Sequence, residues 1–141
     1  MGESNANGKR ILVVEDEPVI SRVCIRILSA EGFEMDIAIN GQIAKNMVSD
    51  REYDLCLIDI RTPAMNGMEL YECLNEEHPE LASRVLFTTG DVLNSSIAAF
   101  LRQAHRPCLG KPFTPEELRM AVRKVLKQEM LATSGREIAK R

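Results

Sequence analysis

Residues 55–67, which read LCLIDIRTPAMNG, decide how this chain folds. They open with the apolar run 55–58, which is typical of a strand buried on both faces of a sheet. Asp59 follows the run directly and is therefore predicted at the carboxyl end of that strand, where ligands collect in open α/β sheets. Pro63 and Gly67 then predict a tight loop that leads away from Asp59.

Apolar runs of strand length alternate with helix-period patterns along the rest of the chain. Pro79 is expected to stop the third helix, and the apolar stripe of the last helix fades after about residue 128. Strands that each lead into a helix predict a parallel sheet with right-handed crossovers and helices on both faces, which is a doubly wound α/β fold of the (βα)5 type. Strands are predicted at residues 11–14, 33–39, 55–58, 85–87 and 107–109, and helices after Glu17, Gly41, Gly67, Asp91 and Thr114.

The composition indicates one globular domain. A chain of 141 residues can bury a single core, and 45% hydrophobic with 28% charged residues is typical of a folded protein. The net charge of −3 argues against a broad nucleic-acid or membrane surface. No apolar run approaches membrane-spanning length, so a cytoplasmic protein is expected. The expected organisation is a disordered segment at 1–9, one domain at 10–127 and a polar tail or helix extension at 128–141.

Polar side chains follow four of the predicted strands, where the carboxyl edge of the sheet would gather them. Carboxylates that meet there repel one another unless a cation intervenes, and Mg²⁺ favours carboxylate and phosphoryl oxygens. A carboxylate can also act as a nucleophile and form an aspartyl phosphate, with a lysine and a hydroxyl group nearby to offset the charge. Taken alone, each residue has a simpler interpretation as a cap, a turn residue or a solvated charge. The set comprises Glu15 and Asp16 after the first strand, Asp59 after the third, Thr88 and Thr89 after the fourth, and Lys111 after the fifth.

This combination resembles the receiver domains of two-component response regulators. The likeness covers about residues 10–127 and implies a flavodoxin-like fold, with a five-stranded parallel sheet in the order 2-1-3-4-5. The spacing agrees as well, with 30 residues from the acceptor aspartate to the threonine and 22 from there to the lysine. The matching residues are Glu15-Asp16, DIRTPAMNG at 59–67, Thr89-Gly90 and Lys111-Pro112-Phe113.

The resemblance implies a phosphoacceptor signalling domain and not an enzyme in the usual sense. Asp59 would take a phosphoryl group from the phosphohistidine of a histidine kinase or a histidine phosphotransfer protein. Asp16 would bind Mg²⁺ or Mn²⁺ directly and Glu15 through water, with Asp59 and the backbone carbonyl of Arg61 as further ligands. Lys111 would pair with the acyl phosphate. The domain would be a monomer or a weak dimer, with no direct contact to nucleic acid or membrane.

The resemblance also implies a switch residue and a backbone feature. Thr89 would bond the phosphoryl group once it is in place. Thr88 competes for that role, but the following Gly90 and the spacing to Lys111 favour Thr89. The peptide bond before Pro112 is expected to be cis.

Two positions depart from the family pattern. Receivers usually carry Tyr or Phe three residues before the lysine, where this chain has Cys108. The small thiol is expected to contribute little to switching, so the signal should pass mainly through residues 89–102. Arg61, two residues beyond the acceptor, is expected to change the lifetime of the phosphorylated state.

Two other classes of protein fit less well. A phosphatase of the haloacid dehalogenase type needs an aspartate two residues after its nucleophile, where this chain has Arg61. A flavodoxin-like FMN-binding protein needs a Ser-, Thr- and Gly-rich loop at 15–17, where the three acids would repel a phosphate.

Two contexts stay open for a receiver. The chain is a stand-alone regulator, or it is the receiver module of a hybrid histidine kinase that acts as a phosphorelay intermediate or a phosphate sink. Residues 88–113 resemble receivers attached to hybrid kinases. No DNA-binding segment is recognised after residue 127, so direct transcriptional control is not expected.

Overall fold

The structure is a computed structural model that describes residues 8–134. The expected disordered start lies outside the described residues except for residues 8 and 9, and so do residues 135–141 of the expected tail. The strands are β1 (Arg10–Val14), β2 (Glu34–Ala38), β3 (Leu55–Asp59), β4 (Val85–Thr89) and β5 (Cys108–Gly110). The helices are α1 (Pro18–Ala30), α2 (Gly41–Asp50), α3 (Gly67–Glu77), α4 (Pro79–Ala82), α5 (Ser95–Ala104) and α6 (Pro115–Ser134).

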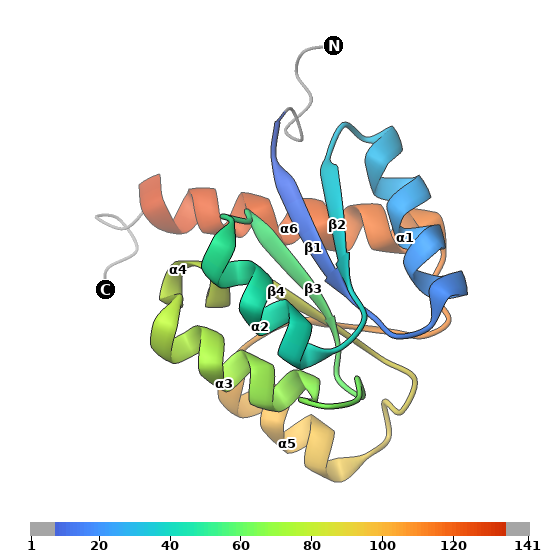
Figure 1. Cartoon of the computed structure of the whole chain (residues 1–141), viewed down its shortest axis with the longest axis vertical. Coiled ribbons are helices and arrows are strands. Elements are labelled where there is room, and N and C mark those ends of the chain that lie inside the picture. Colours follow the sequence, from blue (N-terminus) through green and yellow to red (C-terminus); the bar gives the residue numbers. More distant parts are fainter. Residues whose placement is uncertain (1–7, 135–141) are drawn as a thin grey trace.

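The strands form one parallel sheet in the order β2-β1-β3-β4-β5, which confirms the predicted fold. The sheet lies between two layers of helices (Figure 1). Helices α1 and α6 cover one face, and α2, α3, α4 and α5 cover the other, as the two core clusters record. Because all strands run in the same direction, their carboxyl ends meet at one edge of the sheet.

The alternation of side chains along the inner strands builds both halves of the core. In β3, Cys56 and Ile58 belong to the cluster on the α2–α5 side, whereas Leu55 and Leu57 belong to the cluster under α1 and α6. Every residue of β3 and β4 is buried. A strand that is apolar on both faces, as the run at 55–58 indicates, therefore occupies the centre of the sheet.

One detail differs from the sequence prediction, and one of its open alternatives can be decided for residues 128–134. Pro79 does not only stop α3; it also occupies the first position of the short helix α4, whose Leu81 and Ala82 are buried in the core. Proline is well tolerated at that position because the first amide of a helix has no intrahelical acceptor. Helix α6 continues through residues 128–134, beyond its apolar stripe, because that segment is rich in Glu, Met, Leu and Ala, which favour helix.

Candidate functional site

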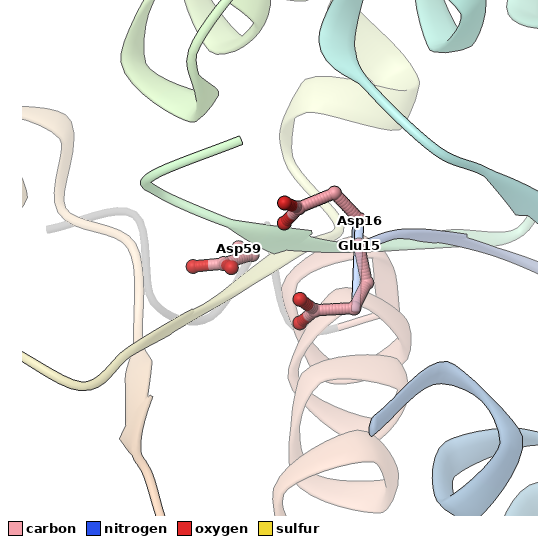
Figure 2. Close-up of side chains that lie close together, drawn as sticks. All are labelled: Glu15, Asp16 and Asp59. Atoms are coloured by element: carbon pink, nitrogen blue, oxygen red, sulfur yellow. The ribbon is translucent and has the colours of Figure 1, made fainter. Parts of the chain in front are cut away.

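Three carboxylates come together at the carboxyl edge of the sheet. Glu15 and Asp16 follow the end of β1, and Asp59 is the last residue of the neighbouring strand β3. One oxygen from each lies within 4.8 Å of the others. Figure 2 shows the three side chains projecting toward the same side of the sheet edge. A cluster of carboxylate oxygens is the donor set that a hard divalent cation such as Mg²⁺ prefers, so the residues present fit that ion.

Lys111 links two of these carboxylates. Its Nζ donates to Asp59 Oδ2 at 3.1 Å and to Glu15 Oε1 at 3.1 Å. The side chains are largely removed from solvent, with exposed fractions of 16% for Lys111, 8% for Asp59 and 3% for Glu15. The lysine predicted from the sequence thus contacts the predicted acceptor directly. The two partners of Lys111 are far from it in the sequence: Asp59 is 52 positions away and Glu15 is 96 positions away.

The pKa values of the cluster reflect excess negative charge. Burial, and then repulsion from Asp59, raises the pKa of Glu15 to about 7, although the hydrogen bond and positive charge of Lys111 act to lower it. Burial alone would lower the pKa of Lys111, but its hydrogen bonds to Glu15 and Asp59 outweigh burial and raise it. A single ammonium therefore does not balance the carboxylates, and an additional cation would relieve the repulsion.

The loop after β3 holds Asp59 in place. The Gly67 amide donates to the Ile60 carbonyl at 2.8 Å, and the buried Thr62 hydroxyl donates to the Met65 carbonyl at 3.0 Å. The Arg61 amide donates to Asp59 Oδ1 at 3.2 Å. This leaves Oδ2 for the contact with Lys111, so the two carboxylate oxygens of the acceptor have different partners.

The turn that starts α3 anchors the other end of this loop. Asn66 and Glu69 form a capping box, in which each side chain accepts a hydrogen bond from the other residue's backbone amide. Such a box satisfies amides that the first turn of a helix leaves free. A second box, between Thr114 and Glu117, starts α6 just after Lys111, where the sequence predicts a helix after Thr114. The peptide bond between Lys111 and Pro112 is cis, as expected.

The two threonines at the end of β4 have different surroundings. Thr88 is paired in register with Asp59, and both line a narrow hollow together with Glu15 and Phe113. The Thr89 hydroxyl accepts a hydrogen bond from the Asp91 amide at 3.0 Å. Successive residues of a strand point to opposite faces, which explains the difference. In the structure described here Thr88 therefore shares a hollow with the acceptor, and the switch role of Thr89 stays a prediction.

Cys108 lies beside an aromatic cluster that the sequence analysis did not identify. It is paired in register with Phe87, whose ring packs edge-on against Tyr71 and Phe100 at centroid distances of 5.7 and 5.5 Å. Burial, and then the charge of Asp59, raises the pKa of the Cys108 thiol to about 11, so the thiol stays neutral. The sequence gives little indication of this cluster, because its three rings lie on three separate elements, α3, β4 and α5, that only the fold brings together.

Arg61 has a partner that was also missed. Its Nη2 lies 2.7 Å from Asp91 Oδ2, and this ion pair joins the loop after β3 to the loop after β4. The side chains are 58% and 43% exposed. A signal existed in the sequence: the cation stands two residues after Asp59, and the acid stands two residues after Thr89. Because β3 and β4 are adjacent and parallel, the loops that follow them lie close together, and oppositely charged residues in these loops can meet.

Comparisons with known proteins point to one family. Residues 11–123 match the family model described as "Response regulator receiver domain". The structure of a response regulator receiver domain protein (CheY-like) from Methanospirillum hungatei JF-1 superposes with a TM-score of 0.79 at 27% identity, covering 88% of this chain and 98% of that one.

Two curated relatives are longer proteins. The transcriptional regulatory protein TcrA of Mycobacterium tuberculosis is 32% identical over 112 residues, which cover 79% of this chain and 44% of TcrA. The regulatory protein AtoC of Escherichia coli (strain K12) is 29% identical over 129 residues, which cover 92% of this chain and 28% of AtoC. The chain thus spans less than half the length of either relative. Within residues 8–134, no helix has the length and apolar character needed to cross a membrane.

Proposed function

The chain belongs to the family of response regulator receiver domains, the signal-receiving domains of two-component systems, and on that premise we propose that Asp59 is its phosphoacceptor. One observation carries the proposal: the Lys111 ammonium is held 3.1 Å from Asp59 Oδ2 inside a cluster of carboxylates. A positive charge fixed beside a carboxylate is suited to an anionic group that forms there.

The proposed reaction is a phosphoryl transfer from a phosphohistidine. A carboxylate oxygen of Asp59 attacks phosphorus, the bond between phosphorus and the imidazole nitrogen breaks, and the imidazole leaves with the bonding electron pair. Lys111 donates a hydrogen bond to the Asp59 carboxylate, and its positive charge would offset negative charge on the transferred phosphoryl group. In hydrolysis a water oxygen attacks phosphorus, the bond between phosphorus and the Asp59 oxygen breaks, and the carboxylate leaves with the bonding electron pair while inorganic phosphate is released. The chain would thereby catalyse only its own phosphorylation, from the phosphohistidine donor, and its own dephosphorylation.

The residues that would hold the divalent cation are Asp16 directly, Glu15 through water, Asp59 and the backbone carbonyl of Arg61. When bound, Mg²⁺ or Mn²⁺ supplies positive charge that neutralises phosphoryl oxygens. Asp16 is exposed and free to bind directly, whereas Glu15 is buried against Lys111. This difference supports the assignment of Asp16 as the direct ligand.

The proposed partners are a histidine kinase or a histidine phosphotransfer protein, which the domain meets as a monomer or a weak dimer in the cytoplasm. The domain is taken to comprise residues 10–127, with 128–134 as a helical extension. The output is proposed to pass through residues 89–102, because Cys108 has no ring to move between two packings.

The Asp16→Ala variant should lose most of the affinity for Mg²⁺. In the wild type, Mg²⁺ should raise the midpoint of thermal unfolding, since a ligand that binds only the folded state stabilises it. The shift should nearly vanish in Asp16→Ala and shrink less in Glu15→Gln, and Mg²⁺-dependent phosphorylation should follow the same order. Asp50→Ala, which removes an exposed acid at the end of α2, is the control and should behave as the wild type. Equal Mg²⁺ shifts in Asp16→Ala and the wild type would refute the assignment.

The two threonines can be separated by NMR with beryllofluoride, a stable stand-in for the phosphoryl group. In the wild type, the largest amide shifts should fall in residues 89–102, and residues 107–109 should move less. Thr89→Ala should bind the anion but lose most of the response in 90–102, whereas Thr88→Ala should keep it. If Thr88→Ala abolishes the response and Thr89→Ala leaves it intact, the switch role belongs to Thr88, as its shared hollow with Asp59 would allow.

A further inference from the structure

The ion pair between Arg61 and Asp91 connects the two loops that flank the acceptor. Its Nη2–Oδ2 distance is 2.7 Å, and both side chains are more than two-fifths exposed. An exposed pair of this kind contributes little to folding, because water screens the two charges and the long side chains lose entropy when they are held together. The pair can therefore open and re-form without unfolding the loops that carry it.

Both members of the pair are also tied to the acceptor site through their backbones. The Arg61 amide donates to Asp59 Oδ1 at 3.2 Å, and the Asp91 amide donates to the Thr89 hydroxyl at 3.0 Å. Asp91 Oδ2 additionally accepts from Asn94 Nδ2 at 3.4 Å, and Asn94 caps the start of α5. The closed pair thus links the acceptor loop to Thr89 and to the first turn of α5.

Phosphorylation would change which anion attracts the Arg61 guanidinium most strongly. A phosphoryl group on Asp59 brings up to about two negative charges and several acceptor oxygens. A guanidinium binds such a group through paired hydrogen bonds, which a single exposed carboxylate oxygen does not match. Lys111 is already shared between Asp59 and Glu15, so it cannot alone neutralise the added charge of the phosphoryl group. The phosphoryl group would therefore also attract Arg61 and compete with Asp91 for its guanidinium.

We infer that Asp91 is a positioning residue that holds Arg61 away from the phosphoryl site, and that Arg61 exchanges Asp91 for the phosphoryl group when Asp59 is modified. This inference rests on the proposed function of Asp59. It assigns Asp91 a role in setting the affinity of the site for phosphoryl-like anions. The exchange would also release the contact between the two loops, next to the start of α5.

The test is a double-mutant cycle read as affinity for beryllofluoride at saturating Mg²⁺. The wild type, Asp91→Asn, Arg61→Ala and the double variant are titrated, and binding is followed by amide resonances. Asp91→Asn should raise the affinity about three- to fivefold, the most that an exposed pair of this strength allows. Arg61→Ala should lower the affinity, and Asp91→Asn should then add nothing in the Arg61→Ala background. Asp91→Glu, which keeps the charge, should remain near the wild type.

The outcomes separate this inference from the proposed function. Equal affinities in Asp91→Asn and the wild type would overturn the inference alone. An equal gain in both backgrounds would also overturn it, because the effect would then be direct repulsion between Asp91 and the anion without the help of Arg61. Failure of the wild type to bind beryllofluoride would overturn the proposed function and, with it, the inference. Thermal unfolding of each variant checks that the loops stay folded.

Discussion

The Asp59→Asn variant should take up no phosphoryl group from acetyl phosphate or phosphoramidate in the presence of Mg²⁺. The side-chain amide has nearly the shape of the carboxylate but is not a nucleophile, so the step that forms the acyl phosphate is lost. Intact-mass measurement should find one added phosphoryl group on the wild type and none on the variant. The effect is a complete loss, not a slower rate.

Asp50→Asn is the matched control for this variant. Asp50 is an exposed aspartate at the end of α2, away from the carboxyl edge of β3, and its loss should leave phosphoryl uptake unchanged. Asp59→Asn should also remain folded, because it removes a charge that repels Glu15. Undiminished uptake by a folded Asp59→Asn protein would mean that another residue is the acceptor.

The Gly67→Ala variant should be destabilised by about 2–3 kcal/mol, in the range for overpacking a rigid site. A Cβ at position 67 would lie 2.7 Å from Ile60 Cα and 2.9 Å from the Asp59 carbonyl oxygen, closer than van der Waals contact permits. Both are backbone atoms that a rotamer change cannot move. Since alanine normally favours a helix over glycine by about 1 kcal/mol, a loss of stability here would report the steric clash. Denaturant unfolding measures the effect, and phosphoryl uptake should fall because the loop carries Asp59.

Gly90→Ala provides the comparison for Gly67→Ala. A Cβ at Gly90 would meet no atom within 4 Å, so this variant should unfold within about 0.5 kcal/mol of the wild type, as surface substitutions usually do. Similar stabilities for Gly67→Ala and Gly90→Ala would show that the contact between the α3 start and the end of β3 does not constrain the acceptor loop.

Much of the fold could be predicted because its strongest signals are local. The apolar run at 55–58 identifies a strand buried on both faces, and alternation with helices then fixes a parallel sheet. The proximity of Glu15, Asp59 and Lys111 follows from the sheet alone, since the carboxyl ends of parallel strands share an edge. The contacts of Lys111 with Asp59 and Glu15 agree with that expectation.

The features that the sequence did not predict depend on contacts between elements. Helix α4 was missed because Pro79 was interpreted only as a stop, although burial of Leu81 stabilises a helical turn after it. The partner of Arg61 was missed because Asp91 is near it only once β3 and β4 lie side by side. The surroundings of Thr88 and Thr89 depend on which face of the sheet each side chain occupies. Two polar residues in a row at the end of a strand do not reveal this from the sequence.

The most direct test of the central claim is chemical identification of the phosphorylated residue. Borohydride reduces an aspartyl phosphate to homoserine, and tandem mass spectrometry of the digested protein locates that residue. After phosphorylation with acetyl phosphate and Mg²⁺, homoserine should be found at position 59 and at no other aspartate. Homoserine at another position, or phosphate retained on a serine, threonine or histidine after reduction, would contradict the assignment of Asp59.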